Sequence, residues 1–263
     1  DALADLGAEP TRWSPAGLRI ALGADARSPG LHAEPAFLKG WVEIQDEGSQ
    51  LAALFSGAAP GEQVVDLCAG AGGKTLAIAA AMQGRGQIFA TDLDKRRLAP
   101  IHERLARAAV RNVQVLTPRS SGDVLADHAG KADLVLVDAP CSGTGAWRRN
   151  PDAKWRMRPT ALQRRLEEQA DVLDRAASLV KPGGRVAYIT CSVLEPENGA
   201  QVRAFVERHS AFAVVPPEQV IAALGDNAAA FRDAALLLPE GVLMTPRRTG
   251  TDGFFVSLLR KRA

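Results

Sequence analysis

Short apolar runs alternate with longer stretches of helical periodicity through the middle of the chain. The apolar runs, which we take as strands, are Gln63 to Leu67, Gln87 to Thr91, Val113 to Leu116, Leu134 to Asp138 and Arg185 to Thr190. The helical stretches are Ser49 to Phe55, Lys74 to Met82, Lys95 to Ala109, Ala161 to Val180 and Glu197 to Arg208. Apolar strands separated by helices are typical of βαβ units. The pattern therefore predicts an α/β fold built on a parallel sheet.

The two ends of the chain depart from this alternation. Prolines interrupt residues 1–40 at Pro10, Pro15, Pro29 and Pro35. We interpret this segment as an irregular lead-in or the remnant of a preceding domain, with residues 41–263 as the principal domain. Near the other end, Gly241 to Thr245 and Phe254 to Leu259 predict a hairpin that adds one late antiparallel strand to the sheet. The segment Ala222 to Leu238, rich in alanine and leucine, is ambiguous.

Composition narrows the class of protein. With 263 residues, 46% hydrophobic and 24% charged, the chain can bury a sizeable core and is ordinary for a globular protein. No run approaches the length of a membrane span, and the acidic start lacks the basic region of a signal peptide. Three cysteines without framework spacing favour a reducing compartment, and no Cys/His spacing suggests zinc. We expect a cytoplasmic monomer with no metal and no membrane partner.

Two cysteines stand directly after predicted strands. Cys141 lies in Asp138-Ala139-Pro140-Cys141-Ser142, and Cys191 follows Tyr188-Ile189-Thr190. Ligands of open α/β sheets bind outside the carboxyl ends of the strands, so both thiols are expected to face one pocket. The thiolate is the nucleophilic form of cysteine, and two thiols in one pocket indicate covalent chemistry. An isolated cysteine is more often a small buried residue, and the pairing outweighs that interpretation.

A glycine-rich turn joins the first of these β-strands to the next helix. It reads Asp66-Leu67-Cys68-Ala69-Gly70-Ala71-Gly72-Gly73-Lys74-Thr75. Glycines let a ligand approach the backbone, and a helix N-terminus offers free N–H groups. The dinucleotide pattern fails because Thr75 occupies its third glycine position, and the phosphate loop of NTPases fails only at Cys68. The third interpretation is the cofactor loop of S-adenosylmethionine enzymes.

The end of the second strand helps to choose among these interpretations. It leads into Thr91-Asp92-Leu93-Asp94, which places an acid where it can bind ribose hydroxyls. Dinucleotide and S-adenosylmethionine folds use that geometry, whereas an NTPase does not need it. Because Leu134 to Asp138 also resembles the magnesium-binding strand of NTPases, a P-loop-type NTPase stays as an alternative.

A basic segment follows the first cysteine motif. It holds Arg148, Arg149, Lys154, Arg156 and Arg158, with Trp147 and Trp155 interleaved and Asp152 as its one acid. Such charges meet phosphates while the rings stack on bases, so the segment predicts RNA binding. The alternative is a merely solvated face, and the net charge of +2 does not by itself demand a polyanionic partner.

Together these motifs resemble the RNA cytosine-5 methyltransferases of the Nol/Nop/Sun type, most closely the bacterial 16S ribosomal RNA methyltransferase B branch. The resemblance rests on Asp66 to Thr75, Thr91 to Arg97, Asp138 to Gly145, Arg148 to Trp155, Lys181 to Ser192, Pro196 to Asn198 and Gly250 to Phe255. It implies a Rossmann-like class I S-adenosylmethionine-dependent methyltransferase fold, with a mostly parallel seven-stranded sheet and one late antiparallel strand. It makes residues 41–263 the catalytic domain.

The resemblance also assigns roles. The implied cofactor contacts are Cys68, Ala69, Gly70, Ala71, Gly72, Gly73, Lys74, Asp92, Asp123 and Asp138. Cys191 would attack carbon 6 of cytosine, and Cys141 would assist release. Asp138 would bond the N3/N4 edge of the base, while Lys74 would orient Asp138 or lower a thiol pKa; a solvent-facing lysine is the alternative.

Two positions depart from the family pattern. Ala71 replaces the usual proline of the turn, and Gly122-Asp123 stands later than the usual Gly-Asp pair after the third strand. Two further functions stay open. One is an RNA-binding assembly factor without catalysis, and the other is a DNA cytosine-5 enzyme that acts through Cys141.

Overall fold

The computed structural model describes residues 2–21, 30–120 and 122–263, without the side chains of Arg156 and Pro159. Its centre is a nine-stranded sheet, counted over these residues. The strands are β3 (Gln63–Asp66), β4 (Gln87–Ala90), β5 (Val113–Val115), β6 (Ala132–Asp138), β7 (Val180–Thr190), β8 (Phe212–Val214), β9 (Leu236–Leu238), β10 (Gly241–Met244) and β11 (Phe254–Lys261). Their order is β5-β4-β3-β6-β7-β11-β10-β9, with β8 beside β11.

The predicted α/β fold with a mostly parallel sheet is confirmed. Strands β3 to β7 pair in parallel, and β11 runs antiparallel between β7 and β10. The predicted late hairpin is β10–β11, in which Val242 faces Val256. The sheet exceeds the predicted seven strands because β8 and β9 also join it. Each has three residues, too few to display the alternation by which a strand is recognised in a sequence.

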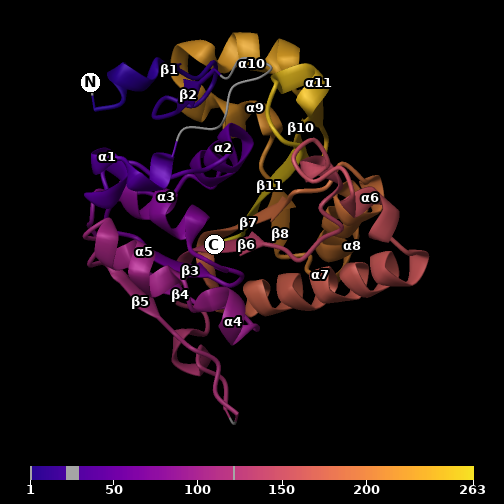
Figure 1. Ribbon diagram of the computed structural model, residues 1–263. Helices are drawn as coiled ribbons and strands as arrows, with labels where there is room; N and C mark the ends of the chain where they lie inside the picture. Colours follow the sequence, from indigo (N-terminus) through magenta and orange to yellow (C-terminus); the bar gives the residue numbers. More distant parts are fainter. Residues whose placement is uncertain (1, 22–29, 121) are drawn as a thin grey trace.

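Helices cover both faces of the sheet (Figure 1). The α-helices of the described residues are α1 (Pro35–Leu38), α2 (Glu47–Phe55), α3 (Gly73–Ala81), α4 (Lys95–Leu98), α5 (Ile101–Arg107), α6 (Ala153–Arg156), α7 (Pro159–Leu179), α8 (Gly199–Arg208), α9 (Pro217–Ile221), α10 (Ala228–Ala234) and α11 (Pro246–Thr249). The single helix predicted over Lys95 to Ala109 is two helices, because Pro100 lacks the N–H that would continue the ladder. No helix in the described ranges is long and apolar enough to cross a membrane.

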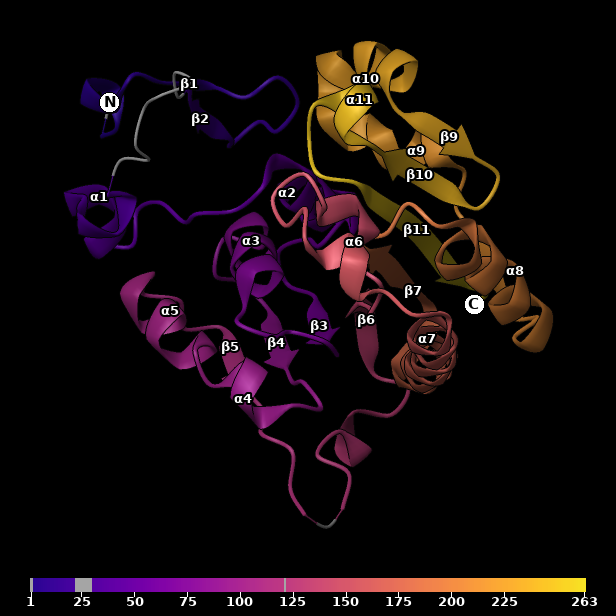
Figure 2. The same ribbon diagram turned by 45° about the vertical axis from the view of Figure 1, so that its right-hand side comes forward.

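Alternating strand residues build two cores. Leu134 and Leu136 of β6 join the core under α2, α3 and α10, whereas Val135 and Val137 join the core under α7 and α8. Figure 2 shows α7 end-on beside β6 and β7. Because successive side chains of a strand point to opposite faces, a sheet covered on both sides needs apolar residues throughout. This explains the uninterrupted run at the end of β6.

The amino-terminal segment, predicted to be irregular, contains a short hairpin. β1 (Ala8–Pro10) and β2 (Leu18–Ile20) pair antiparallel. Between them Trp13 is 2% exposed and packs edge-on against Phe231 at 5.2 Å. Its indole N–H donates to the Thr249 carbonyl at 2.8 Å, and its backbone N–H donates to the buried Glu47 carboxylate at 2.7 Å. This segment is therefore anchored on the core through α2 and α10.

Replacement of Trp13 should destabilise the fold strongly. Trp13→Ala removes a buried ring and its hydrogen bond, which should lower the free energy of unfolding by about 3–5 kcal/mol in urea denaturation. Trp41→Ala is the matched control, because Trp41 is 66% exposed. The control should stay within about 0.5 kcal/mol of the parent. Equal effects of both substitutions would contradict the anchoring role of Trp13.

Candidate functional site

The candidate site lies at the carboxyl ends of β3, β4, β6 and β7. The strand order reverses at β3, which has β4 on one side and β6 on the other. Loops that leave two such neighbouring strands diverge, and the crevice between them is the usual ligand site of open α/β sheets. The glycine-rich turn leaves β3 and the loop with Cys141 leaves β6, so the two predicted motifs meet at this crevice.

The glycine-rich turn borders a small cavity of about 250 Å³. Its lining residues are Ile44, Gln45, Ser49, Cys68, Ala69, Gly70, Ala71, Gly73, Lys74, Arg97, Arg104 and Asp138. Gly70 and Gly72 both have positive φ, at 50° and 84°. A Cβ on Gly72 would lie 2.5 Å from Ile101, so the turn packs closely on α5. Gly72 does not line the cavity, whereas every other predicted turn residue from Cys68 to Lys74 does.

Asp92, just after β4, is buried against the same turn and does not itself line the small cavity. Its Oδ2 accepts the Gly70 N–H at 3.0 Å, its Oδ1 accepts the Asp94 N–H at 2.9 Å, and the Arg97 guanidinium lies 3.7 Å from Oδ2. The carboxylate thus fixes the turn from the end of β4. Each of its oxygens keeps a second lone pair for a ligand hydroxyl.

Asp123 lies apart from this cavity. It sits in the loop after β5, where its half-exposed carboxylate pairs with Arg175 of α7 and accepts the Leu125 N–H at 2.9 Å. It does not line the cavity that holds the turn. The structure therefore brings Asp92 and Asp138 to the turn but not Asp123.

The two predicted thiols meet. Cys141 and Cys191 are both reduced, and their sulfur atoms lie 3.3 Å apart. The shared hydrogen bond raises the pKa of the Cys141 thiol, and burial raises it further. The same bond lowers the pKa of Cys191; burial and the Asp138 carboxylate oppose this, while the Lys74 ammonium assists it. Cys191 is thereby the more readily ionised of the pair.

Lys74 is buried near the two thiols and does not extend into solvent. It is 8% exposed, its Nζ contacts Asp138 Oδ2 at 2.7 Å, and it stands 5.0 Å above the Phe254 ring. The alternative of a solvent-facing lysine is therefore wrong. The third cysteine, Cys68, has its pKa raised by burial and by nearby carboxylates, which fits a structural role for this thiol.

A buried polar cluster joins the two cysteine loops. Ser142 and Ser192, one residue after each cysteine, both donate to Glu197. Glu197 belongs to the motif Pro196 to Asn198 of the family resemblance, but its contacts with both serines were not predicted. Two backbone hydrogen bonds also join these loops to the start of β11. The Gly145 N–H donates to the Cys191 carbonyl at 2.9 Å, and the Gly253 N–H donates to the Gly145 carbonyl at 2.9 Å. A Cβ on Gly145 would lie 2.1 Å from the Gly253 oxygen, so no side chain fits there.

The predicted RNA-binding residues fall into two groups. Arg148 and Arg149 both pair with the buried Asp252, and Arg148 also reaches Asp46 at 3.2 Å. These two guanidinium groups neutralise an internal carboxylate. Lys154 and Arg158 are exposed, and Trp155 is 81% exposed with the Lys154 ammonium 4.8 Å from its ring centre. The side chain of Arg156 lies outside the described residues.

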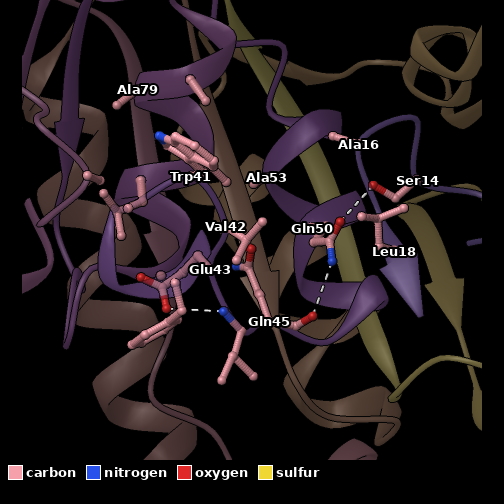
Figure 3. Close-up of a pocket in the computed structure, with 18 of the residues that line it drawn as sticks. Ser14, Ala16, Leu18, Trp41, Val42, Glu43, Gln45, Gln50, Ala53 and Ala79 are labelled. Atoms are coloured by element: carbon pink, nitrogen blue, oxygen red, sulfur yellow. Dashed lines mark hydrogen bonds between the residues drawn. The ribbon is translucent and has the colours of Figure 1, made fainter. Parts of the chain in front are cut away.

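A larger cavity, about 1250 Å³, lies beside the site. It opens between the amino-terminal segment and helices α2 and α3, where Gln50 bonds Ser14 and the Gln45 carbonyl (Figure 3). It shares Ile44, Gln45 and Gly73 with the smaller cavity but is not lined by Asp138. Neither cavity is lined by Cys141 or Cys191, so the smaller one belongs to the glycine-rich turn, Lys74 and Asp138, and the two thiols lie outside its lining.

Comparison with known proteins gives consistent matches. A family model described as 16S rRNA methyltransferase RsmB/F matches residues 55–260. Ribosomal RNA small subunit methyltransferase B of Citrobacter koseri is 34% identical over 244 residues, which cover 92% of this chain and 52% of that protein. The protein of the same name from Salmonella typhi is 38% identical over 180 residues, 68% of this chain and 41% of that protein. The chain thus spans about half the length of the curated relatives it matches.

Solved structures agree. The crystal structure of PH0851 superposes with a TM-score of 0.82 at 31% identity, covering 99% of this chain and 55% of that one. The structure of NSun6 from Pyrococcus horikoshii with SFG gives a TM-score of 0.74 at 25% identity, covering 90% of this chain and 57% of that one.

The carboxyl group of Asp66, beneath the turn, should make stability depend on pH. Burial raises the pKa of Asp66 from 3.8 to about 7, although the hydrogen bond from Thr75 opposes the shift. Because the folded-state value exceeds the unfolded one, its stabilising contribution is complete below about pH 4 and is lost as the pH rises through 7. Between pH 5.5 and 8.5 this loss should reach about 2 kcal/mol.

Urea denaturation at both pH values tests this expectation. Asp66→Asn should remove most of the loss, whereas Asp94→Asn, which changes an exposed acid at the start of α4, should keep it. A parent protein and Asp66→Asn variant with parallel pH profiles would refute the raised pKa.

Proposed function

Since this chain belongs to the 16S rRNA methyltransferase family RsmB/F, we propose that it methylates carbon 5 of a cytosine in ribosomal RNA. The methyl donor is S-adenosylmethionine, and the reaction passes through a covalent bond between a cysteine and the base. The observation that carries the proposal is the pair of thiols 3.3 Å apart beside the Lys74–Asp138 ion pair. Residues 41–263 act as the catalytic domain, in line with the match over residues 55–260.

The turn after β3 suits this cofactor. Its free backbone N–H groups stand at the start of α3, where they can donate hydrogen bonds to a negatively charged carboxylate of the cofactor. Asp92 keeps lone pairs for the ribose hydroxyls, and the left-handed conformation of Gly70 leaves the approach clear of a side chain. When bound there, S-adenosylmethionine supplies an electrophilic methyl group.

The two thiols divide the covalent work. Carbon 5 of cytosine is a weak nucleophile, and addition of the Cys191 thiolate to carbon 6 makes it enamine-like. The lowered pKa of Cys191, which comes first from the Cys141 hydrogen bond and then from the nearby Lys74, favours this residue as the attacking group. Release requires loss of the proton on carbon 5 and cleavage of the C6–S bond, with the electron pair returning to sulfur. Cys141, one hydrogen bond away, assists this step.

Asp138 and Lys74 recognise the base. Asp138 is about one-third exposed at the cavity wall, so its carboxylate can accept a hydrogen bond from the exocyclic amine of cytosine. Lys74 holds that carboxylate in place through the 2.7 Å ion pair. Both thiols are partly buried at the carboxyl ends of β6 and β7, so a base reaches them only after it leaves its stack, which favours single-stranded or loop RNA as the substrate.

The alternatives have less support. An NTPase would need a glycine at Cys68, and the family match opposes it. An assembly factor without catalysis would have no need of two thiols in contact beside the Lys74–Asp138 ion pair. A DNA-type enzyme would attack through Cys141, whose pKa is raised.

RNA binding should depend on the exposed part of the basic segment. Arg148 and Arg149 are unsuitable for charge reversal, because they pair with the buried Asp252. Lys154→Glu should reduce the slope of log K against log salt by about 0.7, and Trp155→Ala should cost about 1–3 kcal/mol of binding to single-stranded RNA. Lys131→Glu, at the amino end of β6, should change neither quantity. Filter binding over a salt series measures both, and an unchanged slope in Lys154→Glu would leave this segment a solvated face.

Removal of each thiol should have a different effect. Cys191→Ala removes the attacking group, so neither methyl transfer nor a covalent RNA adduct should form. Cys141→Ala keeps the attacking thiol, although without the hydrogen bond that lowers its pKa, and removes the group that assists release, so a protein–RNA species stable in denaturing gels should accumulate. Bisulfite mapping of 16S rRNA, with and without the protein, identifies the methylated cytosine.

The reverse result has a definite meaning. If Cys191→Ala traps the adduct and Cys141→Ala abolishes it, Cys141 is the nucleophile and the assigned roles are exchanged. If no variant yields an adduct and the parent leaves every cytosine unmethylated, the cytosine-5 proposal fails.

A further inference from the structure

Glu197 is a fully buried carboxylate in the 3-10 turn Glu195–Glu197, just after the Cys191 loop. Its Oε1 accepts the Ser142 N–H at 2.7 Å and the Gln169 side-chain N–H at 3.1 Å. Its Oε2 accepts the hydroxyl groups of Ser142 and Ser192. All four of these contacts come from donor groups, which together fill the four lone-pair positions of the carboxylate.

These bonds join three segments, in addition to the contacts of Gly145 with Cys191 and of Thr144 with Val193 that already link the two cysteine loops. Ser142 belongs to the loop after β6, Ser192 to the loop after β7, and Gln169 to α7. Gln169 also donates to the Pro140 carbonyl at 2.9 Å, and the Tyr188 hydroxyl donates to the Glu197 carbonyl oxygen at 2.6 Å. The side chain therefore bonds directly to the residue after each catalytic cysteine.

The lack of a cation makes this arrangement informative. Within the described part of the chain, no lysine or arginine forms an ion pair with Glu197. Its two carboxylate oxygens accept hydrogen bonds from neutral donors. Such a carboxylate is costly to bury and is tolerated only when every lone pair is satisfied. A glutamine of the same shape would present an NH₂ group to two donors, so its fit to this site would be poor.

We propose that Glu197 is a positioning residue that keeps the Cys141 and Cys191 thiols within one hydrogen bond of each other. The proposal rests on the proposed function, in which attack and release are divided between these thiols. A base that enters between the two loops pushes them apart, and the four bonds to Glu197 resist this. Misplacement of a reacting group by about 1 Å can cost about 100-fold in rate.

Thiol proximity can be measured without RNA. Diamide oxidises two neighbouring thiols to a disulfide, and peptide mass spectrometry quantifies the Cys141–Cys191 product. We expect Glu197→Gln to slow this oxidation at least ~10-fold, because the rate depends on how often the thiols meet in the right geometry. Glu195→Gln is the matched control, since Glu195 lies two residues away, is exposed and pairs with Arg203. The control should oxidise at the parent rate.

Methyl transfer provides the second measurement. Glu197→Gln should lower kcat about 100-fold while the S-adenosylmethionine Kd, measured by titration calorimetry, stays within about twofold. Retained cofactor binding shows that the variant is folded. If Glu197→Gln does not fold, Ser192→Ala, which removes one of the four bonds, is taken through the same measurements and should show smaller losses of the same kind.

The two proposals fail separately. Unchanged disulfide formation in a folded Glu197→Gln variant overturns the positioning role, whether or not the parent methylates RNA. A parent that oxidises quickly and loses this property in Glu197→Gln, yet methylates no cytosine, keeps the positioning role and rejects the proposed function. An equal loss of cofactor affinity and kcat would make Glu197 a merely structural residue and would also overturn the proposal.

Discussion

The parallel pairing of β6 with β7 is the constraint on which the rest of the site depends. Their register places Asp138 opposite Ile189, so Cys141 and Cys191 leave the sheet at the same edge, three and two residues later. The two thiols are 50 residues apart in sequence and 3.3 Å apart in space. A one-residue slip would turn the apolar side chains of β6 to the wrong faces, and both cores oppose it.

Electrostatics at this edge form one connected set. The Asp138 carboxylate raises the pKa of Asp66, and the Lys74 ammonium lowers it. Lys74 also forms an ion pair with Asp138. The same ammonium favours ionised Cys191. Burial is the main cause of the rise of the Asp66 pKa to about 7, and the Asp138 carboxylate adds to it. The protonation of Asp66 beneath the glycine-rich turn is thus linked to the charges of Asp138 and Lys74.

Much of the fold and the thiol pair could be predicted from the sequence, because strand ends and glycine turns leave local signals. The family indicated by the motifs is confirmed. Pro100, which divides a predicted helix, is a local signal for that break. The pairing of Arg148 and Arg149 with Asp252 was beyond prediction, since it joins residues about a hundred positions apart. The motif that contains Glu197 is visible in the sequence, but its contacts are not, because they require three segments to meet.

The contact between Gly145 and Gly253 bears on biosynthesis. Because Gly145 holds the Cys191 carbonyl and Gly253 holds Gly145, the cysteine loops close only on the start of β11. That strand pairs with β7 in the interior of the sheet, although it begins about 60 residues after Cys191. A nascent chain that has not yet reached Phe254 therefore carries both cysteines without the contact that closes their loops, and the thiol pair is enclosed only once β11 has been made.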